Sequence, residues 1–280
     1  MPKLRFAWVV AGLLSGLLGN IALAAPALAE PQPVAYVDLK YQLVHRGLDK
    51  NFVFQTFADP RNQFMPDVVR KIAYLKKESP EIYQKFLRPE VVAQGRQYLQ
   101  VHRTTLNRAE ARFGVAPAVI VAILTVESGL GNITGKYPIV NVFASLAVMD
   151  TPEVMREAGL SPALRERLRK KAAWGRQELL VFLEYCQTRR LDPYSFSGSW
   201  AGAMGFCQFL PSSLKSCGAD GDNDGKVDLF THADAIFSVA SYLRKSGFQE
   251  GNRGSWRRAV YSYNHSDAYV DTILTLANWY

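Results

Sequence analysis

Apolar residues recur at helical spacing along most of the chain, which predicts a mostly helical protein. The amphipathic patterns occupy residues 66–75, 91–112, 177–189, 234–245, 256–264 and 269–277, and a basic helix is expected over 162–171. A short apolar segment covers residues 139–149. We find no repeat and no Pro/Gly-rich linker within residues 30–280, so we expect one mostly helical unit with two lobes around a cleft.

The most informative helix begins at Pro117, because apolar residues cover all its faces and it carries one carboxylate, Glu127. Pro117 suits the first helical position, and Gly129 and Gly131 suit the end. Glu127 then lies in the last turn, where the helix dipole and the loss of water both disfavour ionisation. A carboxyl that stays protonated can act as a general acid. From this segment alone, a buried glutamate that pairs with a basic residue is an equal alternative.

The first 29 residues have the pattern of a secretory signal. Lys3 and Arg5 precede an apolar run over residues 6–19, and Ala27 and Ala29 supply small residues before a cut at Glu30. This pattern predicts an exported, periplasmic protein that is soluble or loosely attached to the envelope, with an uncleaved membrane anchor as the alternative. No cysteine lies near the cut, so we expect no lipoprotein anchor.

Composition narrows the classes of partner. Removal of Lys3 and Arg5 leaves 31 of the 33 basic residues against 25 acidic ones, and this charge of +6 suits an anionic polymer or membrane surface. No basic run is interleaved with aromatic residues, so nucleic acid is not an expected partner. Of the three cysteines, Cys186, Cys207 and Cys217, one stays unpaired whatever bridge forms, and a bridge between the last two is left open.

Residues 198–213 are rich in glycine and alanine, which lets the backbone come close to a ligand. Ser199 and Gln208 add hydrogen-bonding groups to this wall, and Met204 adds an apolar face. The alternative is that the small residues only let two helices approach each other.

Residues 220–230 match the first half of an EF-hand loop. Asp220, Asp222 and Asp224 stand at positions 1, 3 and 5, followed by Gly225 at position 6. The carbonyl of Lys226 is a further ligand in this pattern. Thr231 replaces the usual glutamate at position 12, and the next available carboxylate is Asp234. The alternative is a turn without metal, although closely spaced aspartates repel one another in the absence of a cation.

A fourth segment, residues 259–271, combines tyrosines with an amide. Tyr263, Asn264 and Tyr269 offer flat faces and polar groups that suit sugar rings, and a core role for the tyrosines is an equal alternative. The chain has four histidines and no Cys/His ligand spacing, which argues against a zinc site.

Taken together and in this order, these segments resemble the MltB-type lytic murein transglycosylases. The matching segments are residues 121–131 with 134–137, residues 202–213, the aspartate loop and residues 263–269, and residues 86–90, His102 and residues 109–115 also fit the family. The resemblance covers nearly all of residues 80–280, and residues 35–80 more loosely.

The resemblance implies a mostly α (α+β) fold with a helical N-terminal lobe over about 30–115 and a lysozyme-like catalytic core over about 116–280. It implies cleavage of the β-1,4 bond between N-acetylmuramic acid and N-acetylglucosamine in peptidoglycan, with Glu127 as the catalytic residue and no catalytic cofactor. The implied substrate-binding residues, to which we add Met204, are Ser199, Gln208, Tyr242, Tyr263, Asn264 and Tyr269. The implied ligands of a structural calcium ion are Asp220, Asp222, Asp224, the carbonyl of Lys226 and Asp234. We expect a monomer whose partners are glycan strands, with cell-wall synthesis enzymes as further candidates.

Ordinary glycosidases use two carboxylates, but no second one stands in the segments around Glu127 and Gly202. Together with this absence, the resemblance implies that one residue acts as acid and then as base, forming 1,6-anhydromuramyl ends without consuming water. The alternatives are a hydrolase on the same fold, a cell-wall-binding scaffold and, last, a calcium-sensing module.

Overall fold

The computed structural model describes residues 32–76 and 79–280, so the predicted signal, residues 1–29, lies outside the described residues. The described chain forms two compact units, each discontinuous in sequence. Unit 1 comprises residues 76, 79–135 and 203–280, and unit 2 comprises residues 32–75 and 136–202. The chain thus leaves unit 2, builds part of unit 1, returns, and ends in unit 1.

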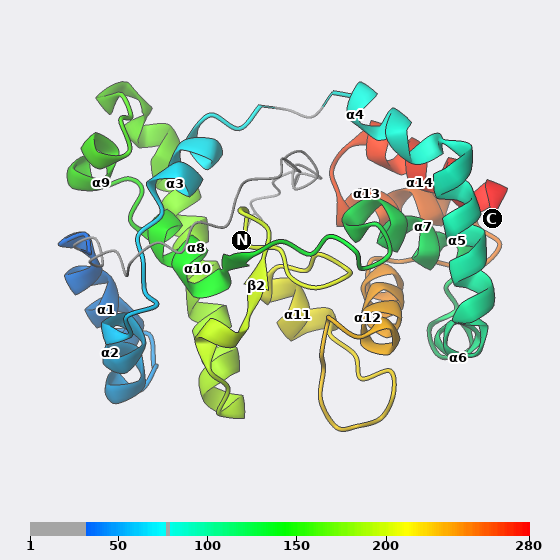
Figure 1. Ribbon diagram of the computed structural model, residues 1–280, viewed down its shortest axis with the longest axis horizontal. Helices are drawn as coiled ribbons and strands as arrows, with labels where there is room; N and C mark the ends of the chain where they lie inside the picture. The colour runs from blue at the N-terminus through cyan, green and yellow to red at the C-terminus, as the bar shows by residue number, and fades with distance from the viewer. Residues whose placement is uncertain (1–31, 77–78) are drawn as a thin grey trace, which may run out of the picture. The chain divides into compact units, whose positions relative to one another are not determined.

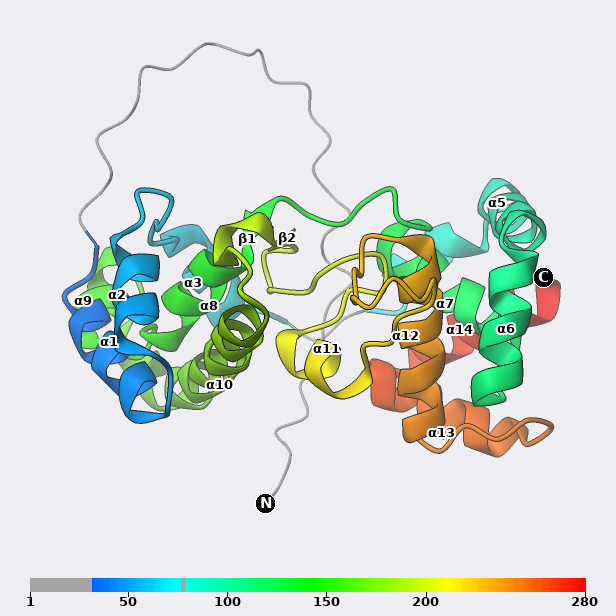
Figure 2. The ribbon, with the colours of Figure 1, turned by 90° about the horizontal axis from the view of Figure 1, so that it is seen from below.

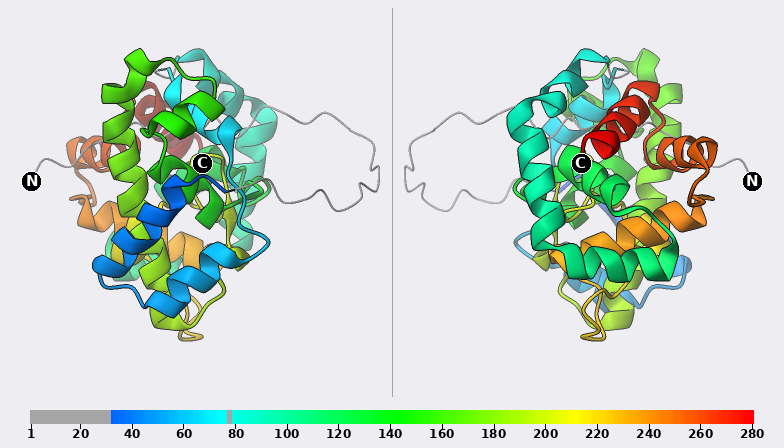
Figure 3. Two further views of the ribbon diagram at one scale, coloured as in Figure 1. Left: turned by 90° about the vertical axis from the view of Figure 1, so that its left-hand side faces the viewer. Right: turned by 90° about the vertical axis from the view of Figure 1, so that its right-hand side faces the viewer.

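Unit 1 is built around one buried helix. Its helices are α4 (Glu81–Gln84), α5 (Pro89–Val101), α6 (Arg103–Phe113), α7 (Pro117–Ser128), α11 (Pro211–Cys217), α12 (His232–Lys245), α13 (Arg253–Tyr263) and α14 (Asp267–Trp279), with a 3-10 turn at Lys85–Leu87. Helices α5, α6, α12 and α14 all pack against α7 (Figures 1 and 3). Because α5 and α6 belong to this packing, the units differ from the lobes expected on either side of residue 115.

Helix α7 has the ends and the burial that its sequence predicts. Pro117 occupies the first turn, and Gly129 ends the helix in the left-handed region at φ 58°. Residues 119–126 are all buried, which confirms a helix that is apolar on every face. The C-terminal residue also holds this helix: the hydroxyl groups of Tyr280 and Thr125 lie 2.9 Å apart, and the Tyr280 ring fills the space beside Gly95. This last contact was not predicted.

The single helix predicted over residues 91–112 is wrong, because the structure breaks it at His102. His102 leaves helical geometry at φ −100° and ψ 18°, and ends α5 just before α6 begins. Its ring lies 4.1 Å from the Tyr98 ring and 4.4 Å from the His232 ring. The break allows α6 to pack along α12, as Figure 2 shows.

Unit 2 has its core where α8 packs against α10. Its helices are α1 (Ala35–His45), α2 (Lys50–Ala58), α3 (Pro66–Ala73), α8 (Ile139–Ala147), α9 (Pro152–Glu157) and α10 (Arg165–Arg189), with 3-10 turns at Pro162–Leu164 and Pro193–Ser195. The strands β1 (Tyr137–Pro138) and β2 (Ser197–Gly198) pair antiparallel, with Tyr137 opposite Gly198. The apolar segment 139–149 proves to be a helix over its first nine residues, all of them buried.

The helices predicted separately over 162–171 and 177–189 form one continuous helix, α10. The segment between them contains Gly175, which lies where α8 comes closest: a Cβ at this position would stand 2.9 Å from the carbonyl carbon of Leu146. Gly175 therefore serves close packing of two helices and does not end one.

Gly175→Val should destabilise the protein by about 2–4 kcal/mol, because the added atoms collide with the backbone of α8. The matched control is Ala173→Val, an exposed position on the same helix, for which we expect about 0.5 kcal/mol or less. Urea unfolding followed by circular dichroism measures both values. Equal effects of the two substitutions would show that the close contact at Gly175 is not a packing constraint.

Two further properties concern the described residues. All three cysteines are buried free thiols, so the bridge left open between Cys207 and Cys217 is not formed.

Across residues 32–76 and 79–280, no single helix has both the length and the apolar character needed to cross a bilayer. Helices α6 and α7 meet these criteria only as a pair that is bent by 114°.

Candidate active site

Glu127 lies in the last turn of α7 and is held by a tyrosine from the other end of the sequence. The hydroxyl of Tyr269 donates a hydrogen bond to Oε1 of Glu127 over 2.6 Å. Glu127 is half-buried, whereas Tyr269 is fully buried on the first turn of α14. Ser266 caps that helix by accepting from the amide of Tyr269, and the ring of Tyr83 packs edge-on against the Tyr269 ring.

Tyr269 keeps its proton throughout the physiological range. Burial is the main cause that raises the pKa of Tyr269 well above its usual value, and the negative charge of Glu127 raises it further. Because Tyr269 keeps its proton, it remains a hydrogen-bond donor that orients the Glu127 carboxyl.

Tyr269→Phe should lower the rate of a reaction that uses Glu127 by about 10- to 100-fold, because the carboxyl loses the donor that orients it. The expected loss is in kcat, while binding of substrate and the melting temperature change little. The matched control is Tyr261→Phe, since Tyr261 is an exposed tyrosine of α13. An unchanged kcat in Tyr269→Phe would show that the hydrogen bond does not serve the reaction.

A short loop, residues 203–210, lies against the end of α7. Met204 and Phe209 exchange two backbone hydrogen bonds, of 2.8 and 3.0 Å, which close the loop. The hydroxyl of Ser128 donates to the carbonyl of Phe206 over 2.6 Å and so ties the loop to the residue after Glu127. Gly205 and Gln208 both have positive φ, of 69° and 49°. The glycine-rich sequence therefore serves a tight loop beside the carboxylate.

Aromatic side chains of α12 and α13 support the same loop. Tyr263 donates to the carbonyl of Cys207 over 2.6 Å, and Tyr242 donates to the carbonyl of Ser262 over 2.6 Å. The rings of Tyr242 and Tyr263 lie 4.7 Å apart, and both contact the ring of Phe209. The amide nitrogen of Gln208 donates to the carbonyls of Gly205 and Thr134.

Six of the seven predicted substrate-binding residues belong to unit 1 with Glu127, and Ser199 belongs to unit 2. Gln208, Tyr242 and Tyr263 are half-buried, whereas Met204, Asn264 and Tyr269 are at most 2% exposed. Sequence reasoning missed Ser128 and the carbonyl of Cys207 as anchors of the loop. The position of Ser128 directly after Glu127 was the one signal available in the sequence. The role of the Cys207 carbonyl could not be predicted, because every residue has a backbone carbonyl.

The aspartate loop brings three carboxylates together. Oxygen atoms of Asp220, Asp222 and Asp224 all lie within 4.8 Å of one another. Desolvation opposes ionisation of Asp220, but amide hydrogen bonds, that of Gly225 first, outweigh it and hold the pKa of Asp220 below its usual value. Ligand oxygens bound 2.3–2.6 Å from one calcium ion lie at most about 5 Å apart, so the observed spacing fits that ion.

The two other predicted ligands have different surroundings. Asp234 is buried, and its two oxygens accept hydrogen bonds from the amides of Gly221 and Asp228, of 2.7 and 2.6 Å. Its carboxylate thus braces the two ends of the loop. The amide of Lys226 donates to Asp224 over 2.8 Å. Leu229, at the end of the loop, accepts from the amide of Phe206 over 2.8 Å, which connects the aspartate loop to the loop beside Glu127.

A family model for the transglycosylase SLT domain matches residues 34–258, and the chain belongs to this family. Over 170 residues the chain is 34% identical to membrane-bound lytic murein transglycosylase B of Escherichia coli K12. That alignment covers 61% of this chain and 42% of the relative, so the chain spans less than half of the relative's length.

Solved structures show the same fold. The lytic transglycosylase SLT35 of Escherichia coli, in complex with calcium, is 22% identical with a TM-score of 0.72, over 87% of this chain and 91% of that one. SltB3 of Pseudomonas aeruginosa, in complex with NAG-anhNAM-pentapeptide, is 23% identical with a TM-score of 0.71, over 86% and 77%. The predictions of the family and of a mostly helical, lysozyme-like fold are therefore confirmed.

Proposed function

We propose that this protein is a lytic transglycosylase that cleaves the β-1,4 bond between N-acetylmuramic acid and N-acetylglucosamine in peptidoglycan. The observation that carries the proposal is the Glu127 carboxyl at the end of buried α7, oriented by the hydroxyl of Tyr269 at 2.6 Å. The complex of SltB3 with NAG-anhNAM-pentapeptide supports an anhydro product for a protein of this fold.

In the proposed reaction Glu127 acts twice. Protonated Glu127 gives its proton to the glycosidic oxygen as the bond from that oxygen to C1 of the muramic acid breaks. The 2-acetamido group of the substrate stabilises the cationic C1. Glu127, now a carboxylate, takes the proton of the muramyl 6-hydroxyl, whose oxygen bonds to C1. The products are a free N-acetylglucosamine hydroxyl and a 1,6-anhydromuramyl end, the enzyme is restored, and no water is consumed.

The predicted binding residues take two roles in this proposal. Gln208, Tyr242 and Tyr263 are half-buried and contact the glycan, for which their amide and rings are suited. Met204, Asn264 and Tyr269 are buried and shape the wall behind these three. Ser199 belongs to unit 2, and its role in substrate binding remains a prediction by similarity to the family.

We also propose that the aspartate loop holds a calcium ion through Asp220, Asp222 and Asp224, with the carbonyl of Lys226 and with Asp234 as the remaining ligands. The close spacing of the three carboxylates supports this site, as does the calcium complex of the structurally similar SLT35. When bound, the ion neutralises the loop's negative charge. The role is structural, because the loop supports the residue 203–210 loop through Leu229.

The predicted signal and the proposed substrate both indicate a location in the periplasm. Export by the predicted signal over residues 1–29 would bring the protein to the periplasm, where glycan strands are its partners. The membrane-bound name of the Escherichia coli relative supports action at the cell envelope. Cell-wall synthesis enzymes are further candidate partners, and a monomer is sufficient for the proposed site.

The deciding experiment is digestion of purified peptidoglycan and mass spectrometry of the fragments. We expect muramyl ends that are lighter by one water than the reducing ends formed by hydrolysis. Reducing ends would identify a hydrolase on the same fold and require a base other than Glu127. Binding without release of fragments would favour a cell-wall-binding scaffold.

A further inference from the structure

Unit 2 carries a cation beside two aromatic side chains that belong to none of the predicted sites. Lys71 lies on α3, Tyr137 begins strand β1, and Trp200 follows strand β2. The ammonium nitrogen of Lys71 is 5.6 Å from the centre of the Tyr137 ring and 6.0 Å from the centre of the Trp200 ring. These three residues form the Lys71 cluster, which lies within unit 2 alone.

The ammonium of Lys71 stands at the hydroxyl edge of the Tyr137 ring. It donates a hydrogen bond to the hydroxyl oxygen over 3.3 Å, whereas the ring centre is 5.6 Å away. A cation above the ring face would be closer to the centre than to the hydroxyl, so Lys71 does not cover this face. Lys71 is exposed, and Tyr137 and Trp200 are half-buried, so a ligand in solution can reach all three.

Helix α8 and the strand pair hold the Lys71 cluster in place. Both α3 and β1 pack against α8. The buried ammonium of Lys171 on α10 donates to the carbonyl of Ile72, the residue after Lys71. Strand β1 pairs with β2, so that Tyr137 lies opposite Gly198. The backbone of the cluster is therefore preformed, which lowers the entropy cost of binding a ligand.

Among the described residues, the structure gives Lys71 no carboxylate partner. Asp67, one turn earlier on α3, pairs with Arg70 instead. The contacts of Lys71 are with the two aromatic side chains. An ammonium that meets a neutral hydroxyl forms a stronger, charge-assisted hydrogen bond with a carboxylate. A single cation of this kind suits a small ligand with one carboxylate.

The two rings supply the apolar part of the recognition. Tyrosine and tryptophan offer a large flat face together with a polar group at the ring edge, and the C–H groups of a sugar ring can pack on such a face. Trp200 directly follows Ser199, which is a predicted substrate-binding residue. A sugar with a carboxylate on a short arm therefore matches both the rings and the cation.

We propose that the Lys71 cluster binds a muramic acid of the glycan strand together with its peptide arm. The sugar packs on the rings of Tyr137 and Trp200, and a carboxylate of the peptide pairs with Lys71. The cluster thus distinguishes anionic muramyl groups from neutral sugars. The proposal rests on the proposed function, which supplies the substrate, and extends it to the peptide arm.

The test is isothermal titration calorimetry with N-acetylmuramyl-L-alanyl-D-isoglutamine, which has one carboxylate and no glycosidic bond to cleave. The matched probe is the same compound with its carboxyl converted to an amide. The unsubstituted protein should bind the acid about fivefold more tightly than the amide. Lys71→Gln should remove this preference. Tyr137→Leu and Trp200→Leu should each weaken the binding of both compounds by about threefold or more.

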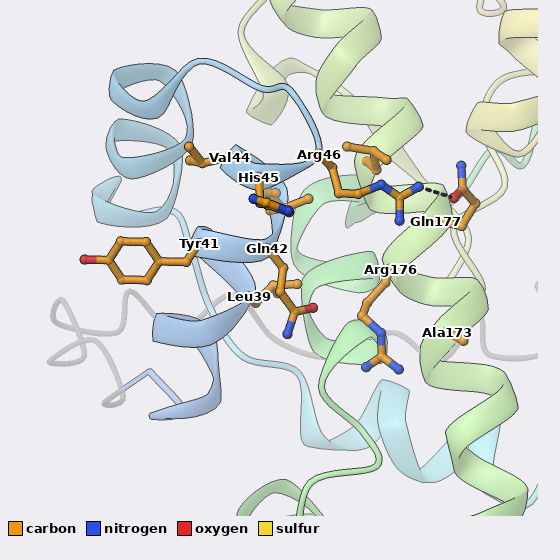
Figure 4. A pocket seen from close by; sticks show the side chains of 11 residues that line it. Leu39, Tyr41, Gln42, Val44, His45, Arg46, Ala173, Arg176 and Gln177 are labelled. Carbon is orange, nitrogen blue, oxygen red and sulfur yellow. Dashed lines mark hydrogen bonds between the residues drawn. The ribbon is translucent and has the colours of Figure 1, made fainter.

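Two variants control for other cations of unit 2. Lys50 is an exposed lysine 5.9 Å from the centre of the Phe54 ring, so Lys50→Gln matches the change at Lys71. Arg46 lines a groove between α1 and α10, where it reaches Gln177 (Figure 4), so Arg46→Gln tests whether the compound binds in that groove. Both variants should keep the full preference for the acid.

Equal binding of the acid and the amide would overturn the proposal. So would a preference that Lys71→Gln leaves intact, or one that Lys50→Gln or Arg46→Gln removes. The result is separate from that of the peptidoglycan digestion. A protein that prefers the acid but releases no fragments would refute the proposed reaction alone, whereas an active protein without the preference would refute the role of the Lys71 cluster alone.

Discussion

Glu127→Gln should lower the release of peptidoglycan fragments by at least about 10³-fold, because the amide can neither give nor take the proton. The shape of the side chain is kept, and the amide oxygen can still accept the hydrogen bond from Tyr269. We therefore expect the melting temperature and the binding of glycan to stay as in the unsubstituted protein. The measurement is the initial rate of fragment release from purified peptidoglycan, with pull-down of the same material for binding.

Glu90→Gln is the control for this substitution, because Glu90 is an exposed glutamate of α5 in the same unit. It should leave the rate within twofold of that of the unsubstituted protein. If Glu127→Gln retains a tenth or more of the activity, another group moves the proton and the proposed double role of Glu127 fails.

Chelation of calcium should lower the melting temperature by about 5–10 °C. An ion present at about 100 times its Kd contributes about 2.7 kcal/mol, and in a chain of this length each kcal/mol shifts the melting temperature by about 2–4 °C. Activity should fall as well, because Leu229 of the aspartate loop accepts a hydrogen bond from Phe206 in the loop beside Glu127. Differential scanning calorimetry with EGTA and then with excess calcium measures the shift and its reversal.

Asp222→Asn should remove most of this response to calcium, since it takes one of the three clustered carboxylates away. Glu250→Gln, an exposed acid of the same unit outside the loop, should keep the full response. The calcium site would be refuted by a melting temperature that neither EGTA nor added calcium changes. A response that Asp222→Asn leaves intact would place the ion elsewhere.

The sequence predicts best those features that depend on neighbouring residues. Pro117, Gly129 and the apolar run between them are sufficient to define α7, and the spacing of Asp220, Asp222 and Asp224 is sufficient to bring their oxygens together. In both cases the physical cause, helix capping or a tight turn, acts within about a dozen residues. The position of Glu127 in the last turn of its helix therefore follows from the local sequence.

Features that depend on distant residues were missed or left open. The hydrogen bond between Tyr269 and Glu127 joins positions 142 residues apart, and no periodicity in either segment indicates it. The predicted helix breaks at His102, whose ring contacts that of His232 in another helix, and the sequence of residues 91–112 does not indicate this contact. Gly175 is unfavourable for a helix in sequence terms, and only the closeness of α8 explains why a glycine stands within α10.

Because both units are discontinuous in sequence, the parts of the candidate site are synthesised at different times. Unit 2 is complete once residue 202 has been made, whereas unit 1 still lacks α12, α13 and α14 at that point. The helix that bears Glu127 is synthesised long before Tyr269, Tyr263 and the aspartate loop, which all follow residue 202. A nascent or prematurely ended chain therefore carries the acid without the groups that orient and surround it. The side chains that surround Glu127 are therefore brought together only after α12, α13 and α14 have been synthesised.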